Sequence, residues 1–442
     1  MPSSRNKNID TLRQSFISVF HFPPSFSANK RRFIITCIAI ICILYILSTV
    51  FYLLRRFNVH SGDFTLYYSI VSKTLDGQIP FRDFPIEYPV LSLIPILIPG
   101  LVNQLFSGSF ESYCSLFVLQ NILLCVLTGY VISRTRITGM ESNNALLTYI
   151  LFSVFSLPLY LYRFDAFPIL LTSIVVFTIF TKPFISGMTW AASIMVKLYP
   201  IVMAPAVGLY FLINLLLKRG LAYLAGVILF STISLAIILP ITGPSIFNFA
   251  QPHQLRGIQL ESIIGGLILL ANKMNLIQVT ITHNYGSFNI DSSISQGIVD
   301  FMKLGAGVIF LLIFLFQGWL FIKEKQLKGT VSQFNLILAI TIWLLSFMIF
   351  NKVLSPQYIL WLFPLISFLN RTIRIKFIVA LMLTITIFPG WYHYLIQLNA
   401  FLVIMLNIRN FLLIWILSDT IKLMLHQVFN TEKDRSIPNR NP

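Results

Sequence analysis

Several carboxylates lie close together in a hydrophilic segment that follows the first long apolar run, 33–54. Asp63 comes soon after that run, and Asp83 and Glu87 follow before the chain becomes apolar again. A carboxylate held beside an apolar phase sits in a low dielectric, where its pKa rises toward values useful for proton transfer. These side chains are therefore candidates for a general base or for substrate binding. The alternative is that they are solvated loop charges.

Other charged residues stand at the ends of later apolar runs or inside them. Asp165 begins one such run beside Arg163, so a substrate contact and an ion pair with Arg163 are both open. Lys197 ends another run, where snorkelling to the membrane interface competes with a binding role. Arg409 lies within the last apolar stretch, where a charge either is functional or marks a helix end.

The elements that position these residues are predicted to be membrane-spanning helices. Of the 442 residues, 56% are hydrophobic and 11% are charged, whereas soluble domains carry about 25% charged residues. The apolar runs are continuous rather than alternating, which predicts helices and an all-α polytopic fold. We expect twelve spans, near 33–54, 113–133, 145–162, 165–181, 185–200, 201–217, 220–242, 298–322, 332–350, 356–369, 376–395 and 399–420.

The basic residues predict how these spans are oriented. Cytoplasmic ends of spans are rich in Lys and Arg. The stretch 89–106 is apolar but contains Pro89, Pro95 and Pro99. If it lies along the outer face without crossing, the later basic clusters fall on the cytoplasmic side together with the N-terminal tail. These clusters are Arg134/Arg136, Lys182, Lys218/Arg219, Lys323/Lys325/Lys328 and Arg371/Arg374/Lys376.

The expected organisation is one transmembrane domain, 33–425, between cytoplasmic tails at 1–32 and 426–442. Its external loops are 55–112 and 243–297. Nine of the 15 acidic residues lie in these loops or at the outer rim of the spans, so chemistry that needs carboxylates is expected on the outer face. A prokaryotic plasma membrane is the default location, with the endoplasmic reticulum as the alternative.

Composition and spacing argue against several other classes of protein. The net charge of +17 is best explained by orientation signals at helix ends, so nucleic-acid binding is not expected. Cys37, Cys42, Cys114 and Cys125 all lie in apolar runs without metal-ligand spacing. No metal site and no cofactor are therefore predicted.

Four short motifs occur in order along the chain. Asp63 is followed by GQIPFRD at 77–83 and EYPV at 87–90; RFD at 163–165 precedes Gly187 and KLYP at 197–200; RGIQLES occupies 256–262; and SPQY at 355–358 precedes Trp361. Together they resemble the GT-C glycosyltransferases. The closest likeness is to glycosyltransferase family 87, the polyprenyl-phosphate-mannose-dependent mannosyltransferases. Phe81 and Val90 depart from that family's usual Tyr and Pro, and neither departure removes a titratable group.

The resemblance implies a GT-C fold that transfers a hexose, with mannose expected, from a polyprenyl-phosphate sugar to a glycolipid or surface glycan. Asp63 would be the general base, and Asp165 would orient the sugar or the acceptor. Arg256 is the first choice for the donor phosphate, with Lys197, Lys352 and Arg409 as secondary candidates. The remaining implied substrate contacts are Asp83, Glu87, Tyr88, Glu261, Gln357 and Tyr358.

Two other classes of function are open at this point. A transporter or flippase of lipid-linked sugars would show repeated halves and ionisable groups at the middle of the membrane. No repeat is evident, and the carboxylates gather on one face. A noncatalytic scaffold in glycan assembly would be expected to lack Asp63, which is present.

Overall fold

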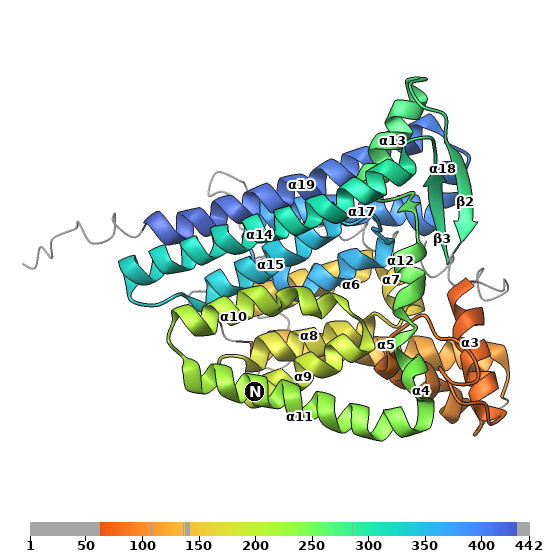
Figure 1. The fold of residues 1–442 in the computed structure, drawn as a ribbon, viewed down its shortest axis with the longest axis horizontal. Coiled ribbons are helices and arrows are strands. Elements are labelled where there is room, and N and C mark those ends of the chain that lie inside the picture. Colours follow the sequence, from red (N-terminus) through yellow and green to blue (C-terminus); the bar gives the residue numbers. More distant parts are fainter. Residues whose placement is uncertain (1–61, 107, 136, 138–141, 285, 431–442) are drawn as a thin grey trace, which may run out of the picture.

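The computed structural model describes residues 62–430 apart from 107, 136, 138–141 and 285. The predicted tail 1–32, the predicted span 33–54 and residues 431–442 lie outside the described residues. The described chain is a bundle of helices with a small sheet at one end (Figure 1).

Six helices of the described part are long and apolar enough to cross a membrane. They are α5 (Phe110–Arg134), α11 (Leu217–Thr242), α14 (Ser295–Lys328), α15 (Gln333–Phe350), α17 (Arg371–Ile385, continuing to Gly390) and α19 (Ala400–Phe429). At about 1.5 Å per residue, α14 and α19 are about 51 and 45 Å long, which exceeds the hydrocarbon thickness of a bilayer. The apolar lengths of α11 and α14 are mostly exposed, so their surroundings must be apolar.

Five further expected spans, all within the described residues, fold as shorter helices, so the structure does not confirm a count of twelve full-length spans. The shorter elements are α6 (Ser142–Phe155), α7 (Leu157–Tyr162), α8 (Ala166–Thr178), α9 (Pro183–Val196), η2 (Tyr199–Met203), α10 (Ala204–Ile213), η4 (Pro356–Leu362) and α16 (Phe363–Ile366). A helix of 14 residues is about 21 Å long, which is short of the roughly 30 Å hydrocarbon core. Proline stands in the first turn of α7, α9, α10 and α16, where a new helix can begin but an old one cannot continue.

The apolar stretch 89–106 forms two short elements, η1 (Val90–Ser92) and α4 (Leu93–Asn103), which follow helix α3 (Gly62–Leu75). Helix α3 has 14 residues, and α4 packs against α3 and α5. With 11 residues, α4 is about 16 Å long and is too short to cross a bilayer as a straight helix. This length agrees with the prediction that 89–106 does not cross.

The segment between α11 and α14 contains the one departure from an all-α fold within the described residues. After η3 (Pro244–Phe247) and α12 (Ala250–Leu255), three short strands flank α13 (Ile263–Lys273). The strands β1 (Ile258–Gln259), β2 (Thr280–Asn284) and β3 (Ser287–Asp291) form an antiparallel sheet in the order β1-β3-β2. Buried Ile258 and Ile290 share an apolar cluster with Leu402 and Leu406 of α19, so the sheet is held against the bundle.

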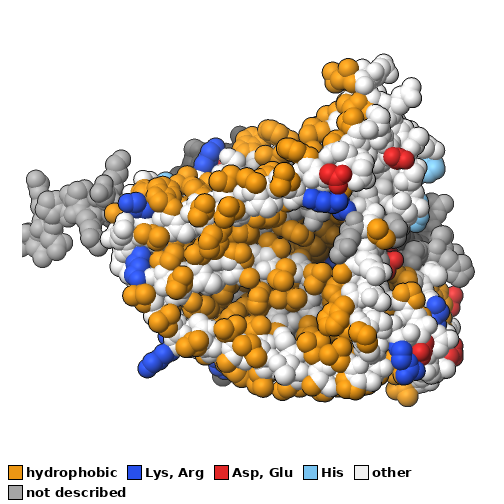
Figure 2. Space-filling view, in the orientation of Figure 1, with side chains coloured by type: hydrophobic (Ala, Val, Ile, Leu, Met, Phe, Trp, Pro, Cys, Tyr) orange, Lys and Arg blue, Asp and Glu red, His pale blue; other side chains and the backbone are white. Residues whose placement is uncertain are grey.

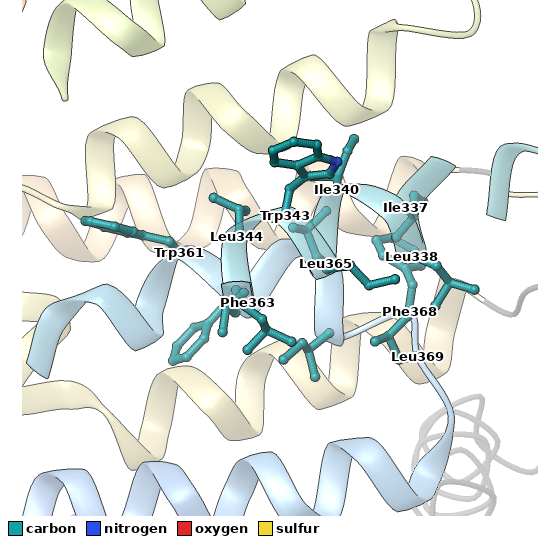
Figure 3. Packing of buried hydrophobic residues seen from close by; sticks show 14 of the residues in the cluster. Ile337, Leu338, Ile340, Trp343, Leu344, Trp361, Phe363, Leu365, Phe368 and Leu369 are labelled. Atoms are coloured by element: carbon teal, nitrogen blue, oxygen red, sulfur yellow. The ribbon is translucent and has the colours of Figure 1, made fainter. Parts of the chain in front are cut away.

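The centre of the bundle is built around α15, η4 and α16. Figure 3 shows Trp343 and Leu344 of α15 among buried side chains that include Trp361 and Phe363. α15 is apolar all round, which is typical of a helix surrounded by other helices. This core fixes the segment that carries Gln357 and Tyr358.

Charged side chains lie mostly toward the two ends of the bundle (Figures 1 and 2). The loops between α10 and α11 and between α14 and α15 lie at one end, where Lys218, Arg219 and Lys325 stand. α3 and the sheet lie at the other end, where Asp76 follows α3. The predicted topology assigns the first end to the cytoplasm.

Single-cysteine labelling tests this orientation. In intact cells, a membrane-impermeant maleimide should modify a cysteine at position 76 and should leave one at position 325 unmodified until the membrane is permeabilised. A Cys-free background is the control. Labelling of position 325 but not of position 76 in intact cells would reverse the assignment.

Candidate functional site

A cavity of about 680 Å³ opens at the end of the bundle that carries α3 and the sheet. α3, the segment after α7, the β2–β3 hairpin and the segment from Asn351 to Trp361 all contribute to its wall. Of the twelve residues that sequence analysis singled out, nine line it: Asp63, Glu87, Tyr88, Lys197, Arg256, Glu261, Lys352, Gln357 and Tyr358. Residues far apart in the sequence are therefore brought to one place.

Asp63 forms an ion pair with Arg163 at the cavity wall. Asp63 lies in the first turn of α3, where the helix dipole favours a negative charge. Phe64 and Tyr67 of α3 pack against Phe117 of α5, and this apolar cluster fixes α3. Both partners of the ion pair are half-buried, so Asp63 remains reachable from the cavity while Arg163 holds its carboxylate.

Asp165 pairs with Lys197, and the ion pair with Arg163 that the sequence left open is not formed. Lys197 Nζ lies 2.7 and 2.8 Å from the two carboxylate oxygens of Asp165, and Trp361 Nε1 donates to Oδ1 at 2.7 Å. Asp165 is 1% exposed and is not among the described residues that line the cavity, whereas Lys197 is. The geometry thus places Asp165 behind Lys197, where it positions that ammonium group.

Three aromatic rings stack beside this ion pair. Trp361 lies 4.1 Å from Tyr199 and 3.9 Å from Tyr358, measured between ring centroids. All three rings line the cavity. Flat aromatic surfaces of this kind suit the apolar face of a sugar ring or an isoprenoid unit.

Arg256 and Lys352 bring further positive charge to the cavity wall. Arg256 Nη2 lies 3.4 Å from Glu87 Oε2, which is a loose contact, and Lys352 Nζ donates to the Arg256 carbonyl oxygen. Burial lowers the pKa of Lys352, with Lys303 and Arg256 adding repulsion. A Cβ on Gly286 would lie 3.9 Å from Arg256 Nη2 and from Glu87 Oε2, so the hairpin lies close to this pair.

Arg409 lies behind the wall and is not among the described lining residues. It sits within α19, well away from both ends of that helix, so the alternative of a misplaced helix end does not hold. Arg409 is 3% exposed, and its guanidinium donates to the Glu261 carbonyl oxygen at 2.9 Å. Any effect of Arg409 on a ligand in the cavity would therefore pass through the segment that carries Glu261.

Asp83 also lies outside the lining that the described residues form. Its carboxylate accepts from Arg82 Nε at 2.9 Å and from the Ile79 backbone N–H at 2.7 Å. Arg82 and this backbone bond lower the pKa of Asp83. The contacts close the turn between α3 and Glu87, which gives Asp83 a role in loop shape.

Several lining residues were not proposed as site residues from the sequence. Arg163 and Trp361 stood in the quoted motifs, but Arg163 was considered only as an ion-pair partner of Asp165, and Trp361 was given no role. Tyr162, Asn351 and Tyr392 carried no distinguishing pattern in an apolar chain. His283 lines the cavity, but within the described residues no group of three or more His, Cys, Asp or Glu could hold a metal ion.

The chain was also compared with known proteins. No protein-family model matches it, and a search of curated proteins found no match.

Proposed function

We propose that the protein is a membrane glycosyltransferase that moves a hexose from a polyprenyl-phosphate sugar to a hydroxyl of a glycolipid or surface glycan. The proposal includes a GT-C-like fold of about twelve spans, an active site on the outer face and mannose as the expected sugar. A lipid-bound donor suits an external site, because the membrane itself can deliver the activated sugar there.

The observation that carries the proposal is the composition of the cavity wall. A reachable carboxylate, Asp63, shares one cavity with the cations Arg163, Lys197, Arg256 and Lys352 and with stacked aromatic rings. Transfer from a lipid phosphate needs each of these: a base for the acceptor hydroxyl, cations for the leaving phosphate and surfaces for the sugar.

The proposed step is a single displacement. The acceptor oxygen forms a bond to the anomeric carbon while the bond from that carbon to the phosphate oxygen breaks. The hydroxyl proton passes to Asp63, and the electron pair of the broken bond leaves with the phosphate. Arg256 and its neighbouring cations stabilise the charge that develops there. One displacement inverts the configuration, so a β-linked donor gives an α-linked product.

Comparison of membranes with and without the chain tests the proposed function. Mass spectrometry of lipid-linked glycans should show a species one hexose smaller when the gene is deleted, and the complete species should return on complementation. Glycans of unchanged mass that accumulate on one leaflet would instead favour a transporter of lipid-linked sugars.

Arg256→Ala is expected to weaken donor binding, because the phosphate loses a charge-assisted hydrogen bond worth about 1.5–3 kcal/mol. That energy corresponds to an increase of roughly 10–150-fold in the apparent donor dissociation constant. Donor titrations of the purified protein measure it. Arg82→Ala is the matched control, since Arg82 is exposed and lies outside the lining described for the cavity. Equal donor affinity in the two variants would show that Arg256 does not bind the donor phosphate.

A further inference from the structure

We propose that Glu261 carries a proton at neutral pH and donates it in a hydrogen bond to an oxygen of the lipid phosphate. The inference rests on the proposed function and adds a binding group to the same cavity. A neutral Glu261 carboxyl group can donate to the lipid phosphate, whereas an ionised carboxylate would repel it.

The backbone around Glu261 is fixed on both sides. The Leu260 N–H donates to the Phe288 carbonyl oxygen at 2.9 Å, and the Ser262 side chain caps α13 by accepting from the Gly265 N–H. Glu261 is 1% exposed and lines the cavity. Its Oε2 atom is buried without a hydrogen-bond partner among the described residues. A buried polar atom on a cavity wall with no protein partner points to a ligand as its partner.

The charged and titratable groups around Glu261 do not neutralise it. Arg409 of α19 bonds to its carbonyl oxygen rather than to its carboxyl group, and Arg163 is paired with Asp63. Tyr392 of α18 is the other group in electrostatic contact. Within the described ranges, Glu261 forms no ion pair with any of them. An unpaired buried carboxylate is costly, and a proton removes that cost.

The net charge of the site depends on this proton. Arg163, Lys197, Arg256 and Lys352 supply four positive charges. Arg409, which lies behind the wall, adds a fifth. With Glu261 neutral, Asp63, Glu87 and Asp165 supply three negative charges, and two positive charges remain in excess for an anionic ligand. With Glu261 ionised, this excess is halved to one positive charge.

Burial raises the pKa of Glu261 to about 8, although Arg409 and Arg163 act in the opposite direction. The protonated form therefore predominates below that value and is lost as the pH rises through it. Affinity for a lipid phosphate should fall over the same range, by up to about tenfold per pH unit for one linked proton. Burial also lowers the pKa of Lys352, so the pH profile must be compared with that of a variant that retains Lys352.

The test is binding of a sugar-free polyprenyl monophosphate to the purified full chain in detergent between pH 6 and pH 10. Glu261→Gln keeps a neutral hydrogen-bond donor, and Glu261→Ala has none. At pH 7 we expect Glu261→Gln to bind within a few-fold of wild type and Glu261→Ala to bind about tenfold more weakly. Above pH 8, the affinity of the wild type for polyprenyl phosphate should fall below that of Glu261→Gln. Glutamine does not titrate, so any pH dependence of the Glu261→Gln variant comes from other groups.

Two results would overturn the inference. One is a Glu261→Gln variant that binds as weakly as Glu261→Ala at pH 7. That result would mean that a neutral hydrogen-bond donor cannot replace Glu261, and that the native side chain acts as an ionised carboxylate. The other is a wild-type affinity that parallels Glu261→Gln from pH 7 to pH 9. If Glu261→Ala does not fold, the comparison of wild type with Glu261→Gln still decides. If wild type binds no polyprenyl phosphate at any pH, the proposed function fails and the inference fails with it.

Discussion

Replacing Asp63 with asparagine is expected to lower the rate of sugar transfer by about 10²–10⁴-fold, the usual contribution of a general base. The amide keeps the shape of the side chain and can still accept a hydrogen bond from Arg163, but it cannot take the acceptor proton. Both residues are half-buried, so water can solvate Arg163 when its charge partner is removed. Protein level and donor affinity should therefore remain near normal while turnover falls.

Asp83→Asn is the matched control, because Asp83 lies in the same loop but bonds Arg82 and a backbone N–H outside the lining that the described residues form. A membrane assay with a labelled lipid donor compares the two variants directly. Near-normal transfer by Asp63→Asn, together with loss of transfer in Asp83→Asn or Asp165→Asn, would show that the base is elsewhere. Full transfer by all three variants would count against the enzyme proposal and favour transport.

Replacing Lys197 with methionine is expected to destabilise the fold by about 3–5 kcal/mol, because Asp165 would be left as a buried carboxylate without its cation. Trp361 Nε1 would remain its one neutral donor among those described. The loss should appear as a lower midpoint of thermal aggregation in detergent. Lys197 also faces the cavity, so transfer should fall as well.

The double variant Lys197→Met/Asp165→Asn separates two causes of lost stability: the unpaired charge of Asp165 and the changed packing at position 197. It has no buried charge at this position, so it should recover much of the stability lost in the single variant. A Lys197→Met protein that is as stable as the double variant would show that Asp165 does not depend on Lys197.

The long apolar runs correctly predicted helices able to cross a membrane, because every backbone group in lipid must be satisfied within the chain. The count of twelve spans is not confirmed, since proline begins a new helix within predicted spans, as at Pro158 and Pro364. Hydropathy averages composition over a window. It therefore does not detect that proline, which lacks a backbone N–H, is tolerated in the first turn of a helix but not in its interior. The small sheet was missed because its strands are only two to five residues long.

The sequence indicated which residues come together better than it indicated the contacts between them. Nine of the twelve predicted residues line one cavity, because motifs quoted together from the sequence lie on segments that converge. The partners were not predictable: Arg163 lies next but one to Asp165 in the chain, yet it pairs with Asp63. The pairing of Arg163 with Asp63 depends on how α3 packs against α5 and against the segment after α7. Packing between segments far apart in the chain leaves no local pattern in the sequence.

The most direct test of the central claim is sugar transfer by the purified protein. The full chain in proteoliposomes would receive a radiolabelled polyprenyl-phosphate hexose and a lipid extract as the source of acceptors. The account predicts that label moves to a larger glycolipid in an Asp63-dependent manner, with release of polyprenyl phosphate. Label that stays on the donor lipid, whether or not it changes leaflet, would contradict the account.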